Sequence, residues 1–238
     1  MLGLYSIVIS VLGALVRHSK EILVIDPSIS VPEIEAFNRM SKASAIPLSY
    51  HLPHFNGCAS LRRAYSDSIA GIIILGSLAS VHDHRPWQKE LINWLDSEVI
   101  SRRIPVFGIC FGHQLIHLMY GGIVSYVHES MDLEIGKRTI HFKDDSRLPI
   151  NPTQGEVFVY HSEQVSMLGK GFEIWSAGGI IPVEASYHSS LPIWTIQAHP
   201  EVTIADCAEF NTDPKTFSNY FGWKIVDTFL DYCLLSSR

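Results

Sequence analysis

Cys110 is the side chain whose neighbours best suit it to act as a nucleophile. It lies in GICFG (residues 108–112), between an apolar run that predicts a buried strand (104–109) and a segment that predicts a helix (111–122). A turn that carries a nucleophile from a strand into a helix needs small residues on both sides. The helix dipole and the free N–H groups at the helix start favour the reactive thiolate. An inert buried cysteine is the alternative, because most free cysteines pack as small apolar side chains.

A base for that thiol is available in PIWTIQAHPE (residues 192–201), which predicts a strand leading into a turn. His199 and Glu201 are two residues apart, and in extended backbone such side chains point to the same side. Glu201 can then orient His199, and His199 can take the thiol proton. A strand-end turn without chemistry is the alternative. The histidine precedes the acid, whereas α/β-hydrolases have the acid first, which argues against that fold.

Alternating strands and helices must position these residues. The predicted elements of the first half are strands at 21–27, 45–55, 70–76 and 104–109, and helices at 31–40, 86–99 and 111–122. This alternation predicts an α/β fold, a three-layer sandwich with a mostly parallel central sheet. Residues 123–196 predict short strands, added to the sheet in antiparallel fashion, and residues 216–235 predict a packing helix. Open sheets of this kind bind ligands at the carboxyl ends of their strands, where Cys110 falls.

The composition narrows the class of protein. The 238 residues are 47% hydrophobic, and the net charge is −6 without a long basic run, so we expect a globular protein and no nucleic-acid partner. The four cysteines form no CxxC pair, which favours a reducing, cytoplasmic setting. His113 and His117 share one helix face but have no third ligand nearby, so we expect no metal site. His82, Asp83 and His84 are expected to make loop hydrogen bonds. No cofactor is predicted, because there is no glycine-rich phosphate loop.

The chain divides into an apolar N-terminal segment (1–20) and a domain (21–238). Residues 1–16 carry no charge but are shorter than the roughly 20 residues of a spanning helix. Three interpretations stay open for this segment. It is a peripheral apolar helix, a membrane anchor that brings residues 1–16 into contact with lipid, or the product of a mis-assigned start.

Two motifs resemble one known family. GICFGHQL (108–115), followed about 90 residues later by QAHPE (197–201), is similar to the class I glutamine amidotransferase family. Weaker blocks are similar to stand-alone members resembling the amidotransferase domain of GMP synthase: GSLASVHDHRPW (76–87), LEIG (133–136) and YHSEQV (160–165). The resemblance covers roughly residues 20–205. It implies a flavodoxin-like α/β sandwich.

The resemblance also implies an activity and a site. Cys110, His199 and Glu201 would hydrolyse the side-chain amide of glutamine, or of a related γ-glutamyl compound, through a γ-glutamyl thioester. The ammonia would pass to a separate synthetase subunit, since the chain ends about 35 residues after Glu201. The backbone N–H groups of Phe111 and of the Gly76–Ser77 turn would hold the oxyanion. The remaining predicted contacts would bind the amino-acid end of the substrate, and they are Gln114, Ser162 and Glu163.

Two departures from the family pattern keep other functions open. The usual Gly-Gly-Pro is GSL (76–78), and the His-Gly-Asp-like block is HSE (161–163). Relatives resembling γ-glutamyl peptidases also carry Gly-Ser at the first position, so a self-sufficient γ-glutamyl peptidase is one alternative. A catalytically inactive regulatory or binding protein of the same fold is another.

Overall fold

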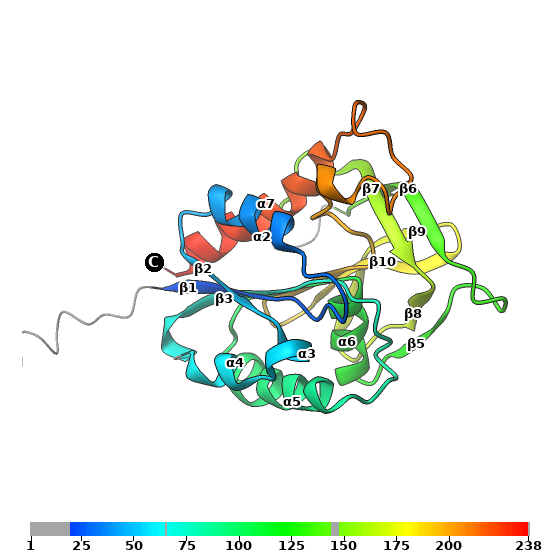
Figure 1. Ribbon diagram of the computed structural model, residues 1–238. Helices are drawn as coiled ribbons and strands as arrows, with labels where there is room; N and C mark the ends of the chain where they lie inside the picture. The colour runs from blue at the N-terminus through cyan, green and yellow to red at the C-terminus, as the bar shows by residue number, and fades with distance from the viewer. Residues whose placement is uncertain (1–19, 65, 144–147, 238) are drawn as a thin grey trace, which may run out of the picture.

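A seven-stranded sheet forms the centre of the computed structural model, which describes residues 20–64, 66–143 and 148–237 (Figure 1). The strand order is β2-β1-β3-β4-β11-β10-β9. The first five strands in that order are mutually parallel, whereas β10 runs antiparallel to both of its neighbours, β11 and β9. The bounds of these seven are β1 Glu21–Ile25, β2 Leu48–His51, β3 Ile69–Ile74, β4 Val106–Ile109, β9 Phe172–Gly178, β10 Ile181–His188 and β11 Ile193–Ile196. The predicted α/β class is confirmed.

Helices cover both faces of the sheet, which makes three layers (Figure 1). One face carries α2 (Ile34–Ala43) and α7 (Tyr220–Ser236). The other carries the short α3 (Pro53–Asn56) and α4 (Ala59–Arg63), together with α5 (Pro86–Trp94) and α6 (Phe111–Met119). Residues 1–19, which hold the apolar N-terminal run, lie outside the described residues. Within the described ranges, no helix is long and apolar enough to cross a membrane.

The apolar core divides between the two faces because successive strand residues point to opposite sides. In β1, Ile22 and Val24 join the cluster under α2 and α7. Leu23 and Ile25 join the cluster under α5 and α6. A strand buried on both faces must be apolar throughout, which explains why the first-half strands are continuous hydrophobic runs.

The helix predicted at residues 86–99 changes type on the way. It is α-helical in α5 and continues as a π-helical segment, η2 (Leu95–Ile100). Trp87, Leu91, Leu95 and Val99 are all buried. An α-helix has 3.6 residues per turn, so side chains spaced four residues apart move gradually around the helix and away from the buried face. The wider π turn compensates for this rotation and returns Val99 to the buried face.

In the second half, β10 and β9 extend the central sheet by antiparallel pairing, as predicted, whereas two further antiparallel pairs form separate two-stranded sheets. β5 (Ile123–Tyr126) pairs with β8 (Glu163–Met167), and β6 (Glu134–His141) pairs with β7 (Gln154–His161). A short 3-10 turn, η3 (Ile204–Asp206), follows the last strand, and another, η1 (Ser66–Ser68), precedes β3. The tail helix begins at Tyr220 rather than 216. Asn219 is the reason, since its side-chain amide donates to Pro200 O (3.0 Å) and Val202 O (2.9 Å) and holds the helix start against that segment.

Candidate active site

Cys110 occupies a strained turn at the carboxyl end of β4. Its φ of 47° and ψ of −97° lie in a region that non-glycine residues rarely adopt. The Cys110 N–H donates to Ile196 O in the neighbouring β11 (2.9 Å), which fixes the turn to the sheet. A β-carbon at Gly108 would lie 2.7 Å from Gly112 O, and one at Gly112 would lie 2.5 Å from Ile74 O. The close packing of the turn therefore requires glycine on both sides of the cysteine.

His199 and Glu201 lie beside Cys110 because β11, the strand before them, is the parallel neighbour of β4. His199 Nδ1 and Glu201 Oε1 are hydrogen-bonded at 2.8 Å, and Glu201 is 3% exposed. The His199 N–H donates to Phe158 O (2.8 Å), which holds the backbone of the turn. Burial alone would lower the pKa of His199, but the Glu201 carboxylate and the Cys110 sulfur raise it well above its usual value. The pair can therefore hold a proton next to the thiol.

Two further groups contact the sulfur, and sequence reasoning gave neither of them a role. Gln197 Nε2 donates to Cys110 Sγ at 3.7 Å, and Sγ lies 3.9 Å from Tyr160 O. Both residues belong to motifs that the sequence had already marked, QAHPE and YHSEQV. The Gln197 amide and the Tyr160 carbonyl reach the sulfur only because strands that are far apart in the chain lie together in the fold.

The residues predicted to bind the amino-acid end of the substrate line the same pocket as Cys110. Gln114 Nε2 donates to Glu163 O (2.9 Å) and His161 Nδ1 donates to the same oxygen (3.0 Å). The Glu163 carboxylate accepts from Ser80 Oγ (2.9 Å). Ser162 O accepts from the Val127 N–H (2.8 Å). The protein thus holds Gln114 and Glu163 in place through their own partners.

The predicted oxyanion turn follows β3. Ser77 Oγ donates to Pro27 O (2.7 Å) and accepts from the Ala79 N–H (3.0 Å), so the turn is tied to the loop after β1. Phe111 is the first residue of α6, where backbone N–H groups have no partner within the helix. Its ring packs against Trp87 with centroids 5.7 Å apart. Phe111 can therefore contribute through its backbone alone.

All predicted site residues except Phe111 line one pocket of about 510 Å³. The pocket opens between the loops that follow β1, β3, β4 and β11, at the carboxyl edge of the parallel strands. Its wall includes residues that the sequence had not singled out, and most of them come from two separate segments. The two segments are residues 28–35 after β1, and a stretch that begins in η3 and contributes Ala205, Asp206, Glu209 and Phe210.

The histidine pair on α6 is occupied by hydrogen bonds. His113 Nδ1 lies 2.7 Å from Thr195 Oγ1, and His117 Nε2 lies 2.8 Å from Ser186 Oγ. Burial lowers the pKa of His117 to about 3, so its ring is neutral. Within the described parts of the chain, no group of three or more His, Cys, Asp and Glu side chains is placed to hold a metal ion. In the 82–84 loop, His82 Nε2 bonds to Val124 O (3.1 Å), as expected of a structural loop.

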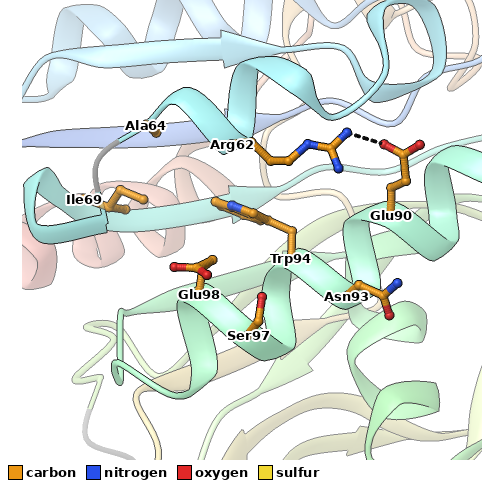
Figure 2. Close-up of a pocket in the computed structure, with 8 residues that line it drawn as sticks. All are labelled: Arg62, Ala64, Ile69, Glu90, Asn93, Trp94, Ser97 and Glu98. Atoms are coloured by element: carbon orange, nitrogen blue, oxygen red, sulfur yellow. Dashed lines mark hydrogen bonds and ion pairs between the residues drawn. The ribbon is translucent and has the colours of Figure 1, made fainter.

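A second hollow, of about 410 Å³, lies between α4, α5 and η2 (Figure 2). Arg62 reaches across it to Glu90 (3.0 Å), and the Trp94 ring lies between the two helices. None of the eight residues that line it belongs to the predicted site, and it holds no cysteine or histidine. The chemistry suggested by the sequence therefore belongs to the larger pocket.

The fold and this pocket together define an α/β protein whose candidate site lies at the carboxyl ends of parallel strands, with a cysteine at a strand-to-helix turn. Residues 43–209 match the family model described as glutamine amidotransferase class-I. The chain belongs to the class I glutamine amidotransferase family, as its motifs had indicated.

Individual relatives carry more specific names. One of them is a subunit of the glutamine-hydrolysing GMP synthase of Methanocaldococcus jannaschii, which is 33% identical over 125 residues, or 52% of this chain and 64% of that protein. The glutamine-hydrolysing GMP synthase of Francisella philomiragia is 33% identical over 56% of this chain but only 24% of its own length. This chain thus spans less than two thirds of either relative.

Solved structures support the fold. A glutamine amidotransferase from Thermotoga maritima superimposes with a TM-score of 0.72 at 17% identity, covering 92% of this chain and 98% of its own. A glutamine amidotransferase from Methylobacillus flagellatus gives 0.70 at 17% identity, covering 92% and 95%. At such low identity the likeness concerns the fold alone.

Proposed function

We propose that this protein hydrolyses a γ-glutamyl amide with Cys110 as nucleophile, His199 as base and acid, and Glu201 as the residue that orients His199. One observation carries the proposal: the strained Cys110 turn adjoins a His199–Glu201 pair whose hydrogen bond measures 2.8 Å and whose carboxylate is buried. Energy stored in a rare backbone conformation is typical of functional sites. Nucleophile, base and orienter then stand in the order that covalent catalysis needs.

The reaction follows from these positions. His199 takes the thiol proton, and the sulfur attacks the γ-carbonyl to form a C–S bond. His199 returns the proton to the leaving nitrogen as the C–N bond breaks. Water, activated by His199, then cleaves the thioester and regenerates the thiol. Glu201 stabilises the imidazolium, consistent with the raised pKa of His199.

The carbonyl oxygen that becomes negatively charged during the attack needs hydrogen-bond donors. The N–H groups of Phe111 and of the Gly76–Ser77 turn are suited to this role, because α6 begins at Phe111 and Ser77 fixes its turn. Such donors typically contribute about 3–4 kcal/mol each to the transition state. Ser162 and Glu163 would bind the amino-acid end of the substrate, next to Gln114.

Glutamine is the first substrate we propose, with ammonia passed to a separate synthetase subunit in the cytoplasm. The support is family membership and the likeness to a subunit of GMP synthase. All four cysteines are free thiols, which suits a reducing compartment.

A second candidate is the hydrolysis of larger γ-glutamyl amides without a partner. The pocket of about 510 Å³ favours it, since its lining includes residues such as Glu33 and Asp206 that the proposed reaction does not use. A leaving group larger than ammonia has room there.

The test is to incubate the purified chain with glutamine and with γ-glutamyl dipeptides, alone and with a GMP synthetase subunit, and to measure ammonia and glutamate. Turnover of glutamine that rises with the synthetase supports the first candidate, and turnover of dipeptides alone supports the second. The Cys110→Ala variant is the matched control for contaminating activity. No turnover of any substrate under any condition would refute both.

A further inference from the structure

Gln197 is a fully buried amide to which the proposed reaction gives no role. It directly follows β11, and its exposed fraction is 0%. Its backbone N–H donates to Glu184 O in β10 (2.8 Å), which fixes the residue to the sheet. Its side-chain Nε2 donates to Cys110 Sγ at 3.7 Å, a hydrogen-bond distance for the large sulfur atom. Because a buried amide costs free energy unless its hydrogen bonds are made, this contact with the sulfur is part of what holds the side chain in place.

The contacts of Gln114 fix which end of the Gln197 amide faces the sulfur. Gln114 Nε2 donates to Glu163 O (2.9 Å), and a backbone carbonyl can only accept. The same nitrogen also donates to Gln197 Oε1 (3.3 Å). Because Gln197 Oε1 is used as this acceptor, Gln197 Nε2 is the atom that faces Cys110. The two amides therefore form a directed chain of hydrogen bonds from Glu163 O to the sulfur.

The sulfur has a second neighbour, which favours the other protonation state. Tyr160 O lies 3.9 Å from Cys110 Sγ and can accept a hydrogen bond only from the thiol. The Gln197 N–H donates most strongly when the sulfur is negatively charged. A hydrogen bond to the charged form of an acid favours that form, and one to the neutral form disfavours it. Gln197 therefore offsets the effect of the Tyr160 carbonyl and favours the thiolate, which is the reactive form.

We propose that Gln197 is a further catalytic residue whose side-chain N–H stabilises the Cys110 thiolate, and that Gln114 is the positioning residue that directs this N–H. The inference rests on the proposed role of Cys110 as nucleophile. Stabilising a thiolate also makes it a weaker nucleophile, but the loss is smaller than the gain. A tenfold larger thiolate population costs only about threefold in intrinsic reactivity, so attack at neutral pH becomes faster.

Titratable side chains approach the sulfur from several elements, and the amide is not one of them. His199 interacts electrostatically with the sulfur, and Glu201 is bonded to His199. His161 and Glu163 lie where β7 ends and β8 begins. Burial lowers the pKa of His161 to about 4, so its ring is neutral at pH 7. Since an amide does not titrate, replacing it with an uncharged side chain leaves all these charges in place.

The experiment measures how fast iodoacetamide modifies Cys110 in the full chain as a function of pH, by mass spectrometry of the peptide that contains it. Only the thiolate reacts, so the midpoint of the profile reports the balance of thiol and thiolate. Gln197→Met keeps the length of the side chain and removes the donor. We expect its midpoint to lie about one pH unit or more above that of the wild type, because a hydrogen bond to a charged group has that strength. An unchanged midpoint in the folded variant would overturn the role of Gln197.

A second variant tests the chain of amides without replacing Gln197. Gln114→Met removes the N–H that holds Gln197 Oε1 and should raise the midpoint by a smaller amount. If Gln197→Met does not fold, an unchanged midpoint in Gln114→Met overturns the proposal. Gln164→Met is the matched control, since Gln164 is a buried glutamine of β8 that is not among the described residues lining the pocket. An equal rise in Gln164→Met would mean that losing any buried amide has this effect, and would also overturn the proposal.

Turnover separates this inference from the proposed function. In Gln197→Met, kcat for the substrate that the wild type hydrolyses should fall about threefold or more at pH 7 and recover in part at higher pH. KM should change little, because Gln197 contacts the sulfur rather than the substrate. A loss of kcat that is equal at every pH would indicate a purely structural role and would overturn the inference. If the wild type hydrolyses no substrate but the midpoints still differ, the proposed function is refuted and the effect of Gln197 on the thiolate stands.

Discussion

Gly76 lies directly against the ring of His199. A β-carbon at position 76 would come within 2.6 Å of His199 Cε1 and 3.6 Å of Cys110 Cβ. The loop after β3 thus packs against two of the residues proposed for catalysis, and only a residue without a side chain fits at position 76. Gly76 was marked by the sequence for its N–H group, but its contact with His199 gives it a second reason to be glycine.

Gly76→Ala is therefore expected to displace His199 and to lower kcat/KM for glutamine by about 10²-fold, as small misplacements of catalytic groups do. Steady-state kinetics, with the substrate that the wild-type chain hydrolyses, measure this loss. Gly178→Ala is the matched control, since a β-carbon there meets Glu184 Cγ only at 3.8 Å, an ordinary contact. Wild-type activity in Gly76→Ala would contradict the proposed position of His199.

Cys110→Ala should lower kcat by at least about 10⁴-fold, because it removes the nucleophile. Cys58→Ala should retain activity. Burial raises the pKa of the Cys58 thiol to about 11, so that thiol is protonated at neutral pH. Mass spectrometry after brief iodoacetamide treatment at pH 7 should accordingly find Cys110 modified first. Preferred labelling of Cys58 would argue against an activated Cys110.

Glu201→Gln should slow turnover, with a loss about one to two orders of magnitude smaller than that of Cys110→Ala, because its proposed role is orientation. The substitution also removes the carboxylate that raises the pKa of His199. A histidine titration followed by NMR should therefore show a lower pKa for His199 in the variant. An unchanged His199 pKa, or a rate loss equal to that of Cys110→Ala, would show that the carboxylate has a different role.

Glu33→Gln should change how stability depends on pH. The pKa of Glu33 is raised from 4.5 to about 8 on folding, so the folded state binds the extra proton between these values. Its stabilising contribution is complete below pH 4.5 and is lost as the pH rises through 8. Tm measured from about pH 5 to about pH 9 should fall more steeply for the wild type than for the variant. Parallel curves would contradict the raised pKa.

Much of the fold was predictable because its determinants are local. The continuous apolar runs of β1, β3 and β4 indicated strands buried on both faces, and GICFG indicated a turn too tight for larger residues. The motifs at residues 108–115 and 197–201 also indicated the family, which the match over residues 43–209 confirmed. The start of α7 was less predictable, because it depends on contacts of Asn219 with a distant segment.

The sequence by itself determined which residue types could do chemistry: a cysteine between glycines, and a histidine two residues before a glutamate. Only the tertiary structure decided what surrounds them. The parallel pairing of β4 and β11 places His199 beside Cys110, and the loop after β1 brings Glu33 to the same pocket as Asp206. The physical reason is that motif spacing reports local backbone geometry, whereas the charge of a pocket is a sum over segments that only the folded sheet brings together.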